Sequence, residues 1–258
     1  MDTFLFDDII FGPVKSRRLG ISLGINLLPT KRKVCTFDCV YCECGLNEDN
    51  KVIDHLPKRA IIMETLAIKI EELLKDGVIP DVITFAGNGE PTIHPDFEEI
   101  INDTIEIRNK LIPNAKIAVL TNSTQLNKPH IFRALKRIDN PILKLDAGNN
   151  DMVQRLDKPF TKFSFDETIK LLIEFGSNSI IQTMFLCGTV NGEPIDNSTD
   201  SEVEQWLEIL KKINPKEVMI YTIDRATPIK TLHKIGITRL NEIRDKVSLL
   251  GFKVQVSG

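Results

Sequence analysis

The sequence predicts an α/β protein folded as a partial (β/α)6 TIM-like barrel, because strand-like and helix-like segments alternate along most of the chain. Short β-branched runs, typical of buried strands, alternate with longer segments whose apolar residues recur at helical spacing. Such alternation indicates a parallel sheet with right-handed crossovers. Six units in 258 residues favour an open or partial barrel over a closed eight-stranded one.

The spacing of apolar residues in each segment predicts whether it forms a strand or a helix. The expected strands cover residues 21–29, 81–87, 116–122, 141–147, 180–188 and 217–224, with a possible terminal strand at 252–256. The expected helices cover residues 61–77, 94–111, 128–138, 165–176, 200–213 and 239–251. Residues 191–200 are the most loop-like segment and could form a flexible lid. We expect one domain over residues 1–258, with residues 1–20 packing near the barrel mouth and no separate domain for further clusters.

Composition and charge argue against some classes of function. The chain is 42% hydrophobic and 27% charged, and its net charge of −3 gives no global attraction to nucleic acid or membranes. No segment approaches the roughly 18 uninterrupted apolar residues of a membrane span. We therefore expect a soluble, cytoplasmic protein without a membrane partner. Residues 9–37 contain six basic residues and no acidic one, which indicates either a solvated surface or a site that stabilises an anion or a negatively charged cofactor.

The cysteines are unevenly distributed. Cys35, Cys39, Cys42 and Cys44 fall within ten residues, and Cys187 is the fifth. This odd, bunched set suits a metal or redox site better than a disulfide framework. A structural zinc site would need Cys44 as its fourth ligand. A four-iron cluster held by three cysteines fits better, and it leaves one iron open to a cofactor.

Polar residues lie at the ends of the expected strands. "GNGEP" at 87–91 follows the second strand, Asn122 and Ser123 follow the third, and Lys144 and Asp146 end the fourth. The active sites of (β/α) barrels lie at this carboxyl edge of the strands. These segments therefore predict one site, although Lys144 and Asp146 could instead form a structural buried pair.

Two motifs resemble a known family. "CTFDCVYC" resembles the C-x3-C-x-aromatic-C cluster motif of the radical S-adenosylmethionine (radical SAM) enzymes, with Tyr41 as the aromatic residue. "GNGEP" is similar to their glycine-rich motif, and a partial (β/α)6 barrel is the family fold. The N-terminal "FGPVKSRRLGISLGINLLP" resembles a subgroup of iron–sulfur oxidoreductases that is loosely related to the wyosine-base-forming tRNA enzymes.

The resemblance implies cofactors and roles. Cys35, Cys39 and Cys42 would hold one [4Fe–4S] cluster, and SAM would bind at its open iron. Reductive cleavage of SAM would give a 5′-deoxyadenosyl radical that abstracts hydrogen from a substrate, with electrons from a donor such as flavodoxin or ferredoxin. The residues expected to bind SAM are Tyr41, Gly87, Asn88, Gly89, Glu90, Asn122, Ser123, Lys144, Asp146 and Tyr221.

Other residues carry two interpretations each. Arg17 or Arg18 could bind the SAM carboxylate or an anionic substrate, or form a surface salt bridge. Cys187 could donate hydrogen or electrons, or be a small buried hydrophobe, and Cys44 is expected to stay free.

The substrate could be tRNA or another RNA, a protein partner as for an activase, or an anionic small molecule. The rival class is a non-catalytic iron–sulfur protein that binds or transfers electrons.

Overall fold

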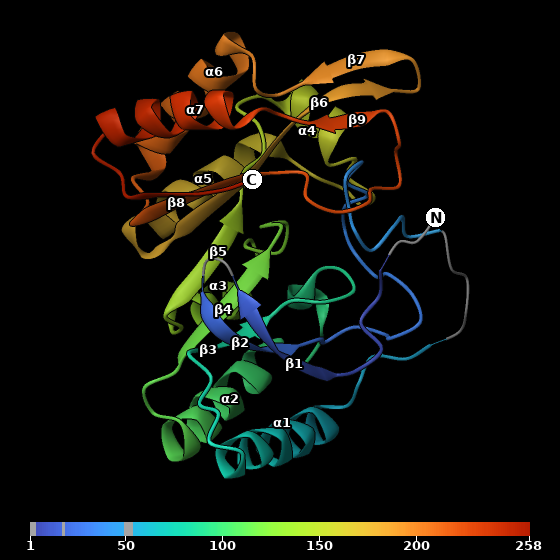
Figure 1. The fold of residues 1–258 in the computed structure, drawn as a ribbon, viewed down its shortest axis with the longest axis vertical. Helices are drawn as coiled ribbons and strands as arrows, with labels where there is room; N and C mark the ends of the chain where they lie inside the picture. Colours follow the sequence, from blue (N-terminus) through green and yellow to red (C-terminus); the bar gives the residue numbers. More distant parts are fainter. Residues whose placement is uncertain (1–3, 17–18, 49–53) are drawn as a thin grey trace.

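The computed structural model describes residues 4–16, 19–48 and 54–258. Its strands form one sheet that curls into an open half barrel, with helices packed on the outside (Figure 1). The parallel strands follow the order β2-β3-β4-β5-β6-β8-β10, and β1 pairs antiparallel with β2 at one edge. The predicted partial barrel is therefore confirmed. Within the described residues, no helix is long and apolar enough to cross a membrane.

The elements have the following bounds. The strands are β1 (Ile10–Ser16), β2 (Gly20–Ile25), β3 (Val82–Phe85), β4 (Lys116–Thr121), β5 (Asn140–Lys144), β6 (Ile180–Val190), β7 (Glu193–Asp196), β8 (Glu217–Thr222), β9 (Leu232–Lys234) and β10 (Val254–Ser257). The helices are α1 (Arg59–Lys75), α2 (Phe97–Leu111), α3 (Pro129–Lys136), α4 (Asn150–Leu156), α5 (Phe165–Phe175), α6 (Asp200–Ile213) and α7 (Ile237–Leu249). Two short 3-10 turns cover Pro91–Ile93 and Gly176–Asn178.

Local sequence explains where the helices begin. Ser164 caps α5 by accepting a hydrogen bond from the amide of Glu167, and Thr199 caps α6 in the same way from Glu202. Both segments have the Ser/Thr-x-x-Glu pattern that favours a helix start. The buried faces of these helices and of the strands form one hydrophobic core outside the barrel lumen.

The structure corrects two sequence expectations. Only one strand was expected before the cysteines, but β1 precedes β2 and pairs with it, with an irregularity between Phe11 and Val14. Pro13 lies at that irregularity. Because proline has no amide hydrogen to donate and is uncommon inside strands, its presence made a strand here hard to recognise from the sequence. The flexible lid expected at 191–200 is wrong for residues 193–196, which form β7 against the long β6.

Gly148 provides a test of how the sheet packs on α6. A Cβ there would lie 2.3 Å from the backbone nitrogen of Trp206, whereas a Cβ on Gly236 would meet nothing within 4 Å. Because helix backbone cannot swing aside, Gly148→Ala should lower the free energy of unfolding by about 2 kcal/mol or more, as overpacking does. Gly236→Ala should cost at most about 0.5 kcal/mol. Urea unfolding measures both, and equal losses would contradict this packing.

Candidate active site

The cysteine loop, residues 26–48, leaves the carboxyl end of β2 and pairs with the glycine-rich segment after β3. The amide of Val34 donates to the carbonyl of Asn88 at 2.9 Å, and the amide of Glu90 donates to the carbonyl of Val34 at 3.2 Å. Gly89 has a φ of 138°, and a Cβ there would lie 1.9 Å from the Val34 carbonyl oxygen. Only glycine allows this approach, so the two predicted motifs are joined through backbone contacts.

Asp38 and Asn47 hold the cysteine loop in shape. Asn47 accepts from the amide of Cys35 at 2.9 Å and donates to its carbonyl at 3.1 Å. Its own amide donates to Asp38 at 2.8 Å. Asp38 also pairs with the ammonium of Lys33 at 3.2 Å. These contacts fix the backbone from which the cysteine side chains project.

Lys33 is buried beside three thiols, with a side chain only 1% exposed. Burial alone would lower the pKa of its ammonium, but the negative charges of Cys42, Cys35 and Cys39 outweigh burial and raise that pKa. Burial also raises the pKa of Cys35 to about 12. A hydrogen bond from Cys44 lowers the pKa of Cys42 to about 6. The loop therefore places a fixed positive charge where thiolates would need one.

A second buried lysine, Lys144, lies beside Cys39. The ammonium of Lys144 lies 2.7 Å from Asp146, 2.9 Å from Asp157 and 3.5 Å from the sulfur of Cys39. It also contacts the hydroxyl of Tyr41 and lies 4.6 Å from the centre of that ring. The alternative of a buried Lys144–Asp146 pair therefore holds. Burial opposes the charged lysine, but the two carboxylates raise its pKa.

Glu90 ties the glycine-rich segment to the end of β4. One carboxylate oxygen, Oε1, accepts from the amide of Thr92 at 3.0 Å and from the hydroxyls of Thr92 and Thr121. Oε2 accepts from the amide of Asn122 at 2.6 Å. Glu90 thus caps the turn after β3, while Oε2 keeps capacity for another donor. Burial raises the pKa of this carboxyl group.

Asn88 and Gly87 both contact other parts of the protein closely. The Asn88 side chain is fully buried; it accepts from the amide of Phe6 at 2.8 Å and donates to the carbonyls of Phe6 and Pro29. A Cβ on Gly87 would lie 2.3 Å from the side-chain oxygen of Asn26. On the side where a Cβ would project, Gly87 and Gly89 are approached by Asn26 and Val34. Both glycines are partly exposed, and a contact of their backbone with SAM stays a prediction.

Three further residues expected near SAM differ in how exposed they are and in how close they lie to the thiols. Asn122 is half-buried, and its amide nitrogen lies 3.6 Å from the sulfur of Cys35. Ser123 is buried in a left-handed turn with φ 69° and supports Asn122 from behind. Tyr221 is half-buried, and it packs with Cys35 and Cys42 on one hydrophobic cluster. Asn122 therefore lies beside the Cys35 thiol, Tyr221 packs on the same hydrophobic cluster as Cys35 and Cys42, and both side chains remain partly exposed.

One predicted candidate, Cys187, is not brought to the thiols. Cys187 lies on the part of β6 that pairs with β7 and β9, and it packs against the main core instead of the cysteine cluster. Burial raises the pKa of its thiol. Arg17 and Arg18 lie outside the described residues.

The sequence alone did not reveal that Lys33 is buried beside the cysteines, and it did not reveal that Asp157 belongs to the site. Lys33 belongs to the basic stretch, and its position two residues before Cys35 was the available signal. Asp157 follows α4 with no motif around it, yet burial raises its pKa to about 7. Only the folded chain shows that this carboxylate reaches Lys144.

The donor set suits an iron–sulfur cluster. No three His, Cys, Asp or Glu side chains among the residues described converge on a single-ion site. A four-iron cluster does not need such convergence, because each cysteine binds a different iron. Cys35, Cys39 and Cys42 lie on one loop, with Lys33 and Lys144 beside them and an amide donor from Asn122. Charge and hydrogen bonding around the sulfurs thus match a buried anionic group.

Comparisons with known proteins show the family of the chain. Residues 32–201 match the model of the Radical SAM superfamily. The chain is 32% identical over 223 residues to a UPF0026 protein of Helicobacter pylori, covering 86% of this chain and 68% of that protein. It is 33% identical over 223 residues to a Brachyspira hyodysenteriae protein named GTPase Obg, covering 84% of this chain but 30% of that protein.

Solved structures share the fold. A radical SAM methyltransferase from Sphaerobacter thermophilus superposes with a TM-score of 0.67 at 15% identity, covering 92% of this chain and 65% of that chain. A structure of TYW1 with a lysine-pyruvate adduct superposes with a TM-score of 0.61 at 12% identity, covering 88% and 73%. Fold, cysteine loop and family model agree, and the chain belongs to the radical SAM superfamily.

Proposed function

We propose that this protein is a radical SAM enzyme that holds one [4Fe–4S] cluster on Cys35, Cys39 and Cys42. When both cofactors are bound, they would supply reductive cleavage of SAM to a 5′-deoxyadenosyl radical, which abstracts hydrogen from a substrate. The observation that carries the proposal is the burial of these thiols beside two lysines, Lys33 and Lys144. The electron donor, for which flavodoxin or ferredoxin is suited, belongs to the proposal as well.

The protein's own groups would balance charge and orient the sulfurs. Lys33 is locked by Asp38 and the carbonyl of Gly45, at 3.2 and 3.0 Å, so its charge cannot swing into solvent. Lys144 is locked by Asp146 and Asp157. Positive charge close to an iron–sulfur cluster favours its reduced form. Lys33, whose one carboxylate partner is partly exposed, would therefore ease the electron transfer on which SAM cleavage depends, whereas the charge of Lys144 is offset by two buried carboxylates.

Three groups would contact SAM next to the thiols. Oε2 of Glu90 accepts one hydrogen bond, from Asn122, and has capacity for an ammonium donor, a charge-assisted bond. Asn122 and Tyr221 are partly exposed. The side chains of Asn88, Ser123 and Asp146 bond to Phe6, Lys144 and Met184 inside the protein, so they would support these groups instead of touching SAM.

SAM cleavage by the reconstituted, dithionite-reduced protein tests the proposal. The wild-type protein should hold about four irons per chain, as one cluster of this type requires, and should form 5′-deoxyadenosine from SAM without oxygen. Cys39→Ala should lose the intact cluster and all product. Cys44→Ala tests the assignment of three ligands, because the Cys44 thiol bonds to Cys42 and contacts the carbonyl of Gly87 but is not a proposed ligand. Cys187→Ala is the matched control, because Cys187 packs against the main core instead of the cysteine cluster.

Chromatography of 5′-deoxyadenosine, with iron and sulfide analysis, gives the readout. Retention of the cluster and the product by Cys44→Ala would agree with the assignment of three ligands. A wild-type protein that carries the cluster and binds SAM without product, with or without cell extract as a substrate source, would favour the rival electron-transfer function.

Lys33 should set the reduction potential of the cluster. Lys33→Met removes a buried positive charge, so the potential should become more negative by on the order of 50 mV, close to the 59 mV that changes a one-electron equilibrium tenfold. Lys31→Met, an exposed lysine two residues earlier, should leave it unchanged. A redox titration followed by electron paramagnetic resonance measures both. Equal potentials in the two variants would show that the Lys33 charge does not act on the cluster.

A further inference from the structure

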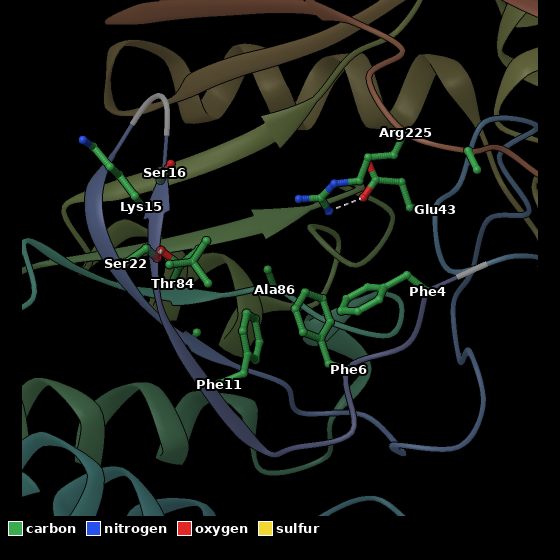
Figure 2. A pocket seen from close by; sticks show the side chains of 13 residues that line it. Phe4, Phe6, Phe11, Lys15, Ser16, Ser22, Glu43, Thr84, Ala86 and Arg225 are labelled. Atoms are coloured by element: carbon green, nitrogen blue, oxygen red, sulfur yellow. Dashed lines mark hydrogen bonds and ion pairs between the residues drawn. The ribbon is translucent and has the colours of Figure 1, made fainter. Parts of the chain in front are cut away.

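A cavity of about 570 Å³ lies between the β1–β2 edge of the half barrel and the segment after β8 (Figure 2). Its walls come from the N-terminal segment, the inner faces of β2 and β3, the cysteine loop and residues 225–226. The lining residues are Phe4, Phe6, Phe11, Val14, Lys15, Ser16, Ser22, Gly24, Glu43, Thr84, Ala86, Arg225 and Ala226. This volume is in the range of small-molecule sites, about 300–1,000 Å³.

An aromatic row formed by Phe4, Phe6 and Phe11 lines one wall (Figure 2). The rings of Phe6 and Phe11 stack with centroids 3.8 Å apart, and Phe4 meets Phe6 edge-on at 4.9 Å. The row is anchored by backbone contacts: the amide of Phe4 donates to the carbonyl of Glu43 at 2.8 Å, and Phe6 is held by Asn88. A flat apolar ring would pack well against this fixed aromatic wall.

Polar groups face the row from two sides (Figure 2). The hydroxyls of Ser22 and Thr84 bond to each other at 2.8 Å at one end. At the other end Arg225 points into the cavity and pairs with Glu43 at 2.7 Å. That pair uses a single Nη1 contact, so the guanidinium keeps further donors for a second anion. Both side chains are largely exposed, and such an ion pair is weak and exchangeable.

The cavity adjoins the proposed cluster site. Glu43 lies between Cys42 and Cys44, and Ala86 directly precedes Gly87 of the glycine-rich segment. A molecule held in the cavity would therefore lie next to both cofactor-binding segments. No residue of the aromatic row and no part of the Arg225–Glu43 pair belongs to the sites assigned above to the cluster or SAM.

We propose that this cavity binds the substrate, and that the substrate is a small organic anion. Its flat, apolar ring would pack on the aromatic row, and its carboxylate or phosphate would displace Glu43 as the ion-pair partner of Arg225. The inference rests on the proposed function, because it names the class of molecule on which the radical acts. Arginine suits this role because its planar fork can bind a carboxylate with two parallel hydrogen bonds.

The structure favours a small molecule over RNA as the occupant. Lys33 of the basic stretch is buried and paired with Asp38, so it offers no charge to a phosphate backbone. Lys15 lies at the cavity rim, at the end away from Arg225 (Figure 2). Nonspecific RNA binding needs several phosphate contacts, whereas the cations that line this cavity among the described residues are Lys15 and Arg225, and Arg225 is paired with Glu43.

Calorimetric titration of the anaerobically reconstituted protein with 2-naphthoate tests the inference. The neutral isostere 2-naphthamide and the non-aromatic cyclohexanecarboxylate are the comparison ligands. Naphthoate should bind more tightly than either. Arg225→Gln should weaken naphthoate binding about tenfold, the value of a lost charged hydrogen bond, whereas Glu43→Gln should strengthen it because the competing carboxylate is gone.

The matched control is Arg133→Gln. Arg133 has the same side-chain exposure as Arg225, 61%, and pairs with Glu98 at 3.0 Å on the outer surface, so its loss should leave naphthoate binding unchanged. Phe6→Leu keeps an apolar side chain but loses the stacked ring, and it should weaken naphthoate severalfold while affecting cyclohexanecarboxylate less. Circular dichroism and iron content would show that each variant is folded and loaded.

Three results would overturn the inference: equal affinity for naphthoate and naphthamide, equal effects of Arg225→Gln and Arg133→Gln, or displacement of naphthoate by SAM. A wild-type protein that forms 5′-deoxyadenosine but does not bind naphthoate would refute this ligand class while leaving the proposed function intact. Naphthoate binding that follows the predicted variant order, without SAM cleavage, would refute the proposed function and retain the ligand site.

Discussion

The burial of negative charge is the constraint on which this site depends. Three thiols share a loop that is packed into a hydrophobic cluster, where thiolates or an anionic cluster would be costly without compensation. Lys33, paired with Asp38, would supply that compensation, and Lys144 lies beside Cys39 with its own charge balanced by Asp146 and Asp157. Removing Lys144 would leave two buried carboxylates without their cation, and removing Lys33 would leave Asp38 without its cation, which is strongly unfavourable. The lysines thus matter to the fold and to the chemistry together.

A second dependence follows from the pairing of Val34 with Gly89. It joins the cysteine loop to the glycine-rich segment, and Asn88 in turn joins that segment to Phe6. The N-terminal aromatic row, the thiols and the end of β3 are therefore one connected unit. A ligand on the aromatic row would lie against the same backbone that positions the cysteines, which links substrate binding to the cofactor site through short contacts.

The sequence was sufficient to predict the barrel and the cysteine triad, because strand–helix alternation and closely spaced thiols are local signals. It did not reveal β1 and β7, where Pro13 and Pro194 interrupt short strands. It predicted that Asn88 and Ser123 lie near the site but not that they are buried, because their burial arises from segments far apart in the chain. Asp157 and the aromatic row had no signal, since only the folded chain brings Asp157 to Lys144 and Phe4 to Glu43.

The central claim is that three cysteines leave one iron of the cluster open to SAM. Electron paramagnetic resonance of the dithionite-reduced protein, recorded with and without saturating SAM, tests it most directly. The account predicts that SAM changes the g values and shape of the cluster signal, because SAM becomes a ligand of the open iron. An unchanged signal, with SAM binding demonstrated by equilibrium dialysis of the same sample, would contradict it.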